Sequence, residues 1–345
     1  MCRPLRFARS AMAAVLLILV TLQAGCMPSD RSVISQAEQF NGGIKPAIVT
    51  DSQIAGYMQR VGDCIIAAAK TTQQANDPNN AWMFSKDMQF HIVNSKTLNA
   101  FTTGGEHMYV YNELFQQCKT EDELAAVMAH EFAHVYCRHV HQGMRRQYYT
   151  LGAAAAAGGA GYLAGGKEKG GEYAGWAAAA AMAAGQFIGM SYTRSDEAQA
   201  DDLGFRFYVL AGWDPNRFPD FFQHMIDLGY DKGNEMLSDH PSLSSRVQTA
   251  KQEAAKLPPT AKNWRKPAVA TATEFRNLQL RAQQVAKTMP DDQSLQKTQQ
   301  ILAAMPRGCL TPAIHEDQKQ AEAAIMRDVE QAQKSAEKQP KKKPG

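Results

Sequence analysis

The segment that decides the fold is residues 120–141, which read TEDELAAVMAHEFAHVYCRHVH. Thr120 and Glu123 match a capping box, the pattern in which two side chains satisfy the first free backbone amides of a helix. The segment therefore predicts a long helix that opens at Thr120 and runs past His141.

A metal-binding pattern lies on this helix. His130 and His134 stand one turn apart, so both imidazoles project from one face and can bind one metal ion. Glu131 lies about 100° around the helix axis, where its carboxylate can reach a water on that metal. His139 and His141 lie more than one turn beyond His134, too far along the predicted axis to share its metal. The pattern predicts a catalytic zinc centre, which needs a third protein ligand and an open fourth position.

Two carboxylates are candidates for completing this centre. Glu197 and Asp201 are four residues apart at the start of a helix predicted over 195–210, so they share one face. One of them can bind the metal while the other orients a ligand imidazole from behind. The alternative is that both are solvated acids in the first turns of that helix.

Five segments together resemble the HtpX/Oma/CAAX-prenyl-endopeptidase family of gluzincin-type zinc metallopeptidases. The resemblance is strongest to the soluble periplasmic and lipoprotein members, the BepA/LoiP/YcaL type, and it covers roughly residues 50–255 in consistent order. The segments are Asn99–Gly105 with Met108–Tyr111, HEFAH at 130–134, RSDEAQAD at 194–201, AGWDP at 211–215, and His240-Pro241-Ser242 followed by Arg246.

The resemblance implies roles for individual residues. It implies one Zn²⁺ per chain, held by His130, His134 and Glu197, with Asp201 in support and Glu131 as the general base. The resemblance further implies that two later residues, His240 and Arg246, act at the site. His240 would either donate to the developing oxyanion or cap the open zinc position, and Arg246 would either assist the oxyanion or pair with a buried carboxylate. An edge strand that pairs with an extended substrate is implied at Asn99, Phe101, Met108 and Val110.

The expected fold class is α+β and mainly helical. A minimal gluzincin domain spans residues 51–257, with a small sheet beside the HExxH helix from strands near 88–93 and 108–111. Residues 151–190 are rich in Ala and Gly and are interpreted as a helical hairpin. Residues 258–345 begin with a Pro-Pro pair and are predicted to form a helical C-terminal extension with a Lys-rich tail. No repeat pattern for partner binding is convincing there.

The first fifty residues indicate export. Arg residues precede an apolar run in residues 1–25, which is typical of a secretory signal peptide. Cys26 follows small residues, as in a bacterial lipobox, and would become a lipidated N-terminus. Residues 26–50 are then a tether, and the expected location is the periplasm, anchored to the outer membrane by the lipid. A plain signal peptide or an uncleaved anchor are the alternatives.

Composition limits the possible functions. The chain has 345 residues, 44% of them hydrophobic and 21% charged, which excludes a wholly disordered chain. The mean hydropathy of -0.40 excludes a polytopic membrane protein. The formal net charge of +3 is supplied by three N-terminal arginines, and no basic stripe predicts nucleic acid binding. The mature cysteines allow one or two disulfides, or act as small buried hydrophobes: Cys64, Cys118, Cys137 and Cys309.

The predicted function is a zinc endopeptidase of the bacterial envelope that cleaves unfolded or misassembled proteins as quality control. Partners would be unfolded polypeptides and possible envelope assembly machinery. The alternative is a non-catalytic chaperone or assembly factor on the same fold. The intact Glu131 favours the enzyme, because a binding protein has no need of a general base.

Overall fold

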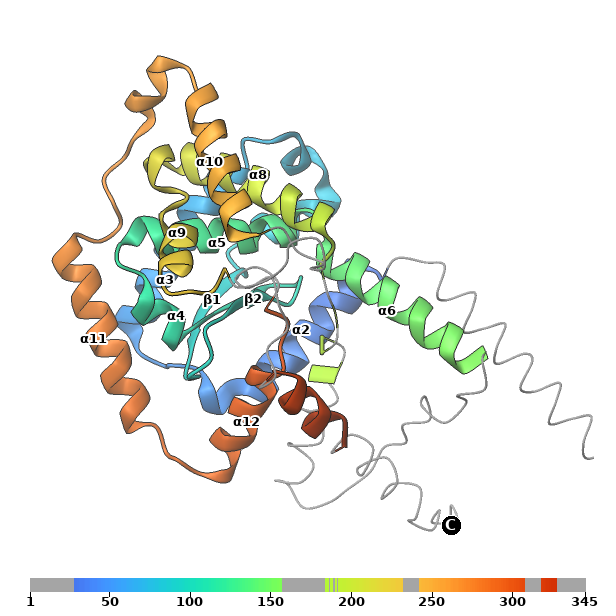
Figure 1. Ribbon diagram of the computed structural model, residues 1–345. Helices are drawn as coiled ribbons and strands as arrows, with labels where there is room; N and C mark the ends of the chain where they lie inside the picture. The colour runs from blue at the N-terminus through green and yellow to red at the C-terminus, as the bar shows by residue number, and fades with distance from the viewer. Residues whose placement is uncertain are drawn as a thin grey trace, which may run out of the picture.

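A small sheet lies among helices in the computed structural model of the protein (Figure 1). The structure describes residues 28–156, 184–185, 187–188, 190, 192–231, 242–307 and 318–327. The main elements follow in chain order: α2 Asp30–Ile44, α3 Ser52–Ala69, β1 Gln89–Val93, β2 Ala100–Thr102, β3 His107–Tyr111, α4 Asn112–Gln117, α5 Glu121–Tyr136, α6 His139–Ala156, α8 Arg194–Ala211, α9 Asp220–Asp227, α10 Leu243–Lys256, α11 Ala272–Thr288 and α12 Gln293–Ala303. The predicted mainly helical α+β class is confirmed.

The sheet has the order β1-β3-β2, with β3 in the middle. β1 runs parallel to β3, and β2 runs antiparallel to it with Phe101 opposite Tyr109. The prediction that Met108 and Val110 form an exposed edge is therefore wrong, because both lie on the central strand and are buried. The edge strand of this segment is β2, which contains Phe101 and follows Asn99 directly.

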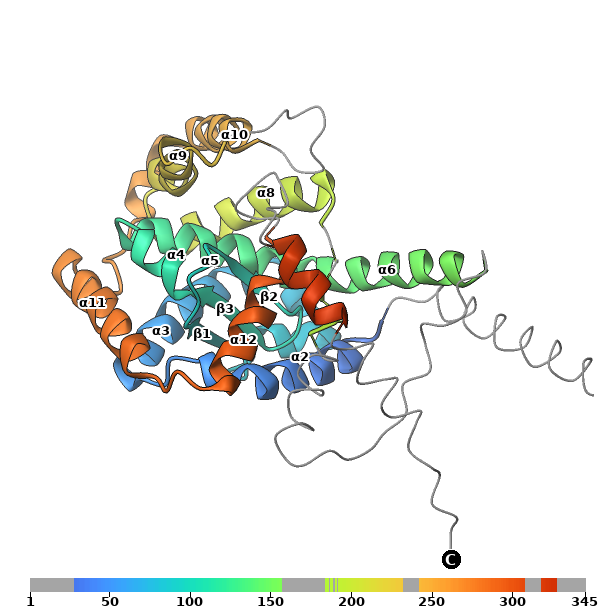
Figure 2. The same ribbon diagram turned by 60° about the horizontal axis from the view of Figure 1, so that its bottom comes forward.

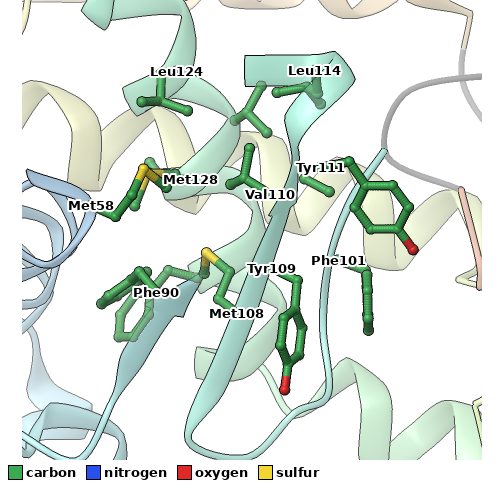
Figure 3. Packing of buried hydrophobic residues seen from close by; sticks show 14 of the residues in the cluster. Met58, Phe90, Phe101, Met108, Tyr109, Val110, Tyr111, Leu114, Leu124 and Met128 are labelled. Atoms are coloured by element: carbon green, nitrogen blue, oxygen red, sulfur yellow. The ribbon is translucent and has the colours of Figure 1, made fainter. Parts of the chain in front are cut away.

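The two faces of β3 contact different parts of the molecule. Side chains alternate along a strand, so Met108 and Val110 share one face. Figure 3 shows this face turned toward Met58 of α3 and Met128 of α5. On the other face, the ring of Tyr109 stacks on Phe101 with 5.0 Å between ring centroids. The sheet is thus covered on one side by the helix that carries the HExxH motif.

That helix, α5, is the centre of the molecule (Figure 2). Every residue from Glu121 to Tyr136 except Asp122 is buried. The Thr120 side chain accepts from the Glu123 amide, and the Glu123 carboxylate accepts from the Lys119 amide, so the predicted helix start is confirmed. The predicted helix length is wrong, because α5 ends at Tyr136 and a new helix, α6, begins at His139.

The second helix of the site, α8, packs directly on α5. Its N-terminus is fixed by a capping box between Thr193 and Asp196. Gly204 permits the close approach, because a Cβ built there would meet the Cα of His130 at 2.9 Å. A methyl group at this contact point has no room, so the glycine sets the distance between the two helices.

The N-terminal tether predicted over 26–50 is wrong for its helical part. Residues 30–44 form α2, whose Val33, Ala37 and Phe40 are fully buried. Phe40 makes edge-to-face contacts with Phe101 and Tyr109, so it joins the main core. The polar composition that suggested a tether belongs to the solvent face of an amphipathic helix.

The C-terminal extension packs into the same core. Phe275 of α11 and Ile301 and Leu302 of α12 are buried in one cluster with the residues of the sheet and α5. In Figure 1, α11 lies along the flank of α3 and α4. The helical prediction for this region holds over α11 and α12, and the extension is an integral layer rather than an appendage.

Several predicted features lie outside the described residues. These are the signal peptide, Cys26, most of the 151–190 hairpin beyond Ala156, His240, Cys309 and the Lys-rich tail. Cys64, Cys118 and Cys137 are free thiols in the described structure. No helix in the described ranges combines the length and the apolar character that crossing a membrane requires.

Candidate metal centre

Three buried donors converge between α5 and α8. His130 Nε2 and His134 Nε2 are 3.0 Å apart. Glu197 Oε2 lies 3.4 Å from the first of these nitrogens, and Glu197 Oε1 lies 3.8 Å from the second. All the donor atoms lie within 4.8 Å of one another, and each residue is at most 1% exposed.

These separations fit a zinc ion. Ligand atoms about 2.0–2.1 Å from a tetrahedral metal are about 3.3 Å from one another. Two imidazoles and one carboxylate form a donor set that zinc accepts in catalytic sites. The described residues contain one such group of three. Glu131, the neighbour of His130 on α5, is fully buried with it.

The His130 ring is oriented by a charged pair behind it. His130 Nδ1 lies 2.9 Å from Asp201 Oδ1, and Arg246 binds both oxygens of that carboxylate at 2.6 and 2.8 Å. Arg246 Nη2 also lies 3.2 Å from His130 Nδ1, but that nitrogen uses its proton toward Asp201 and is no acceptor. The Arg246 guanidinium rests 4.1 Å above the centre of the Phe222 ring.

The charges of this group are strongly perturbed. Burial raises the pKa of Asp201, but the Arg246 charge and the hydrogen bond from His130 outweigh it and lower that pKa to about 2. Burial and Arg246 lower the pKa of His130, whereas hydrogen bonds to Asp201 and Glu197 raise it, with a net value of about 9. A metal ion that binds His130 near neutral pH must therefore displace a proton.

The His134 ring has a different support. Its Nδ1 lies 2.9 Å from His139 Nδ1, and His139 Nε2 lies 3.0 Å from Gln199 Oε1. Tyr192 stacks on the His134 ring with 4.0 Å between centroids. His139 is not one of the three converging donors, but it contacts His134 directly, whereas the prediction placed it further along the same helix axis.

The reason lies in the end of α5. Arg138 adopts a left-handed backbone with φ of 55°, so the chain turns sharply and His139 comes back to His134 instead of continuing along the axis. The sequence interpretation missed His139, Gln199 and Tyr192. A signal was available only for the first of these, as a histidine five residues after His134.

The other predicted site residues are placed unequally. Asp201 lies behind His130, as the paired-carboxylate pattern suggested. Arg246 comes closest to the second of its two predicted roles, since it pairs with the Asp201 carboxylate, whose side chain is 14% exposed. Asn99 is fully buried, and its amide donates to the Pro306 carbonyl at 3.0 Å. His240 lies outside the described residues.

The fold and this donor set define a class of protein, the zinc-dependent peptidases whose ligand histidines lie one turn apart on a helix. The chain belongs to peptidase family M48, because residues 56–254 match that family. Zinc is the metal that this family uses, and His130, His134 and Glu197 could hold it.

Curated relatives agree with this family. A relative from Vibrio cholerae, whose name refers to a beta-barrel assembly-enhancing protease, is 32% identical over 217 residues, which are 61% of this chain and 41% of the relative. The beta-barrel assembly-enhancing protease of Escherichia coli K12 is 27% identical over 216 residues, again 61% and 41% of the two chains. Metalloprotease LoiP of the same organism is 24% identical over 243 residues, 68% of this chain and 92% of LoiP. The chain thus spans about two fifths of the length of the first two relatives.

Proposed function

We propose that this protein is a zinc metalloendopeptidase in which His130, His134 and Glu197 hold the metal and Glu131 is the general base. The observation that supports this most strongly is that three buried donors converge within 4.8 Å of one another. Glu131, the residue after the ligand His130 on α5, is buried beside them. When bound, zinc polarises a substrate carbonyl and lowers the pKa of a water molecule toward about 7. Glu131 accepts the proton of the attacking water and returns it to the leaving amine.

Extended polypeptide is the substrate class that we propose for this site. β2 is the edge strand beside α5, and Asn99 accepts from the Tyr111 amide of the central strand. Hydrogen-bonded pairs alternate in an antiparallel ladder, so Phe101 also turns its backbone groups toward β3. The backbone groups of Ala100 and Thr102 are then directed away from β3, to the side where an added strand would bind. Both residues are only 1% exposed, so an added strand must displace the chain that covers this edge. Only an unfolded or loop segment can adopt that form.

The cellular setting is also a proposal. The signal-like residues 1–25 and the lipobox-like Cys26 support export and a lipid anchor in the outer membrane, facing the periplasm. The names of the relatives from Vibrio cholerae and Escherichia coli that match over 217 and 216 residues refer to beta-barrel assembly, which supports a role in envelope protein quality control and contact with assembly machinery. Incorporation of a labelled fatty acid into the wild-type chain, but not into Cys26→Ala, tests the anchor.

Zinc content and proteolysis together test the catalytic proposal. We expect about one zinc per chain, cleavage of a denatured substrate, and loss of zinc in His134→Ala. Glu131→Gln should retain the zinc and the fold and lose at least about a hundredfold in activity, the contribution of a general base. A wild-type chain that binds zinc and unfolded protein without cutting it would favour the chaperone alternative. His240→Ala belongs to the same assay: higher basal cleavage indicates a capping role, and lower cleavage indicates oxyanion stabilisation.

A further inference from the structure

We infer that His139 is a positioning residue, which fixes the rotation of the His134 imidazole so that Nε2 faces the metal. The inference rests on the proposed zinc site and extends it to a residue that is not a ligand. It is carried by contacts at both nitrogens of His139, to His134 on one side and to Gln199 on the other.

The hydrogen-bond directions follow from the chemistry of the donors. If Nε2 of His134 binds a metal, its Nδ1 must carry the proton. His139 Nδ1, at 2.9 Å, is then the acceptor, and the proton of His139 lies on Nε2. That nitrogen is 3.0 Å from Gln199 Oε1, an amide oxygen that can only accept. The contacts of His134, His139 and Gln199 are therefore consistent with one arrangement, in which Nδ1 of His134 and Nε2 of His139 carry the protons and Nε2 of His134 is left for the metal.

Two restraints act on the same ring in different ways. Tyr192 stacks on His134 at a centroid distance of 4.0 Å and an interplanar angle of 25°, which holds the plane of the imidazole. Stacking does not prevent a flip of the ring by about 180° around the Cβ–Cγ bond, because both orientations lie in the same plane. The bond to His139 removes this freedom, because it fixes which way Nδ1 points.

A backbone turn at Arg138 places His139 beside His134. Arg138 is the single described residue other than glycine with a positive φ. Its guanidinium is held by both oxygens of Asp30, at 2.9 and 2.8 Å, and by Asn80 at 2.6 Å. This anchoring secures the turn between α5 and α6 and brings His139, which is fully buried, against His134.

The two ligand histidines therefore have unequal partners. His130 donates to a carboxylate that is itself paired with Arg246, whereas His134 donates to an imidazole backed by an amide. Loss of His139 would leave a buried N–H without its acceptor and the ring free to turn. Partners of this kind typically change metal affinity by about 10–100-fold.

His139→Phe and His139→Asn test the inference in the full chain. Phe keeps a flat ring without an acceptor, and we expect zinc to bind about 10–100-fold more weakly than in the wild type. In the cobalt-loaded protein, the visible absorption bands should shift, because the ligand geometry changes. The amide oxygen of Asn can accept the bond, so His139→Asn should restore most of the affinity and the wild-type bands. If His139→Phe does not fold, His139→Ala replaces it with the same two measurements.

His141→Phe is the matched control. His141 is equally buried, lies two residues further on α6, and its Nε2 is 3.0 Å from Asp30 rather than near a ligand. It should lower thermal stability without changing zinc affinity or the cobalt bands. Wild-type affinity and wild-type bands in the His139→Phe or His139→Ala protein would overturn the inference. Absence of zinc binding in the wild type would instead overturn the proposed function.

Discussion

At the scale of single residues, His91 on β1 shows how burial controls charge. Its ring stacks on Tyr109 with 5.2 Å between centroids, and its Nε2 lies 3.1 Å from His107 Nδ1. Burial, assisted by His107, lowers the pKa of His91 from 6.5 to about 4. The folded protein therefore keeps His91 neutral at a pH where the unfolded chain already protonates it.

We predict that this histidine makes the protein sensitive to acid. Because the pKa is lower in the folded state, the stability it contributes is complete above pH 6.5 and is lost as the pH falls toward 4. The loss amounts to at most about 3 kcal/mol. Urea unfolding of the wild type and of His91→Gln between pH 7 and pH 4 measures it, and the difference between the two curves isolates His91. Parallel curves over that range would contradict the prediction.

Residue patterns predicted the part of the site that depends on local geometry. His130 and His134 could be paired from sequence because helical spacing alone puts them on one face. His139 could not, because its position depends on where α5 ends, and that end is set by the long-range contact of Arg138 with Asp30. The role of Arg246 stayed open for the same reason, since its partner Asp201 is 45 residues away in the chain.

At the scale of elements, the site depends on how closely α8 approaches α5. Glu197 and Asp201 reach the two histidines only because Gly204 allows backbone contact at His130. Close contacts of this kind are rigid, because interiors are packed nearly as densely as crystals. The distance between these two helices therefore determines the ligand geometry.

Gly204→Ala is predicted to damage both stability and metal binding. The new Cβ would meet the His130 Cα at 2.9 Å and backbone N at 3.0 Å, so the helices must separate. We expect the free energy of unfolding to fall by about 1–3 kcal/mol and zinc affinity to fall with it. Gly56→Ala is the control, since a Cβ there meets only Arg60 Nη1 at 3.6 Å and should stabilise α3 by up to about 1 kcal/mol. Equal effects of the two changes would refute the argument.

The edge strand gives a second prediction at this scale. Ala100→Pro removes an amide directed away from β3, so the ladder and the zinc should persist while cleavage of an unfolded substrate falls several-fold. Phe101→Pro removes an amide directed toward β3 and should unfold the domain. The comparison uses zinc content and cleavage rate for both variants. Normal cleavage by Ala100→Pro would exclude this edge as the substrate site.

The strands themselves were predictable from alternation, but their order was not. The segments near 88–93 and 108–111 are confirmed as β1 and β3. The sequence does not show that β1 pairs with β3 in parallel. This pairing makes the strand that carries Met108 and Val110 the middle strand of the sheet. The polarity of a single strand does not reveal such pairing when both faces are buried.

At the scale of the whole molecule, one buried carboxylate joins the peptidase core to the C-terminal extension. Glu121, at the start of α5, accepts from Tyr57 at 3.2 Å and from Trp213 at 3.1 Å. It also accepts from the Val269 and Ala270 amides, each at 2.7 Å. The sequence predicted a boundary at Pro258-Pro259, but it could not show that the chain beyond returns to the zinc helix.

Gln279 makes a second connection of this kind, and its geometry resembles a helix cap. It is 1% exposed, and its amide nitrogen donates to the Phe115 carbonyl at 2.6 Å and to the Cys118 carbonyl at 2.7 Å. These carbonyls lie at the end of α4, where helical partners are missing. The backbone carbonyl of Gln279 in turn accepts from the Gln116 side-chain amide at 2.9 Å. A side chain of the C-terminal extension therefore supplies the hydrogen-bond donor that the carbonyls at the end of α4 lack.

We predict that Gln279→Ala weakens the whole fold, because it leaves two buried carbonyls without their donor. An unsatisfied buried polar group costs about 1–3 kcal/mol, and the change should lower the free energy of unfolding by about that amount or more. Gln283→Ala is the matched control, since it removes the same side chain from an exposed position on the same helix and should change stability by less than about 0.5 kcal/mol. Chemical unfolding followed by circular dichroism measures both.

If the extension were an independent appendage, Gln279→Ala would leave the peptidase domain as stable as the control, and the two transitions would coincide. A single cooperative transition shifted only by Gln279→Ala is the expected result, because α11 and α5 share one core.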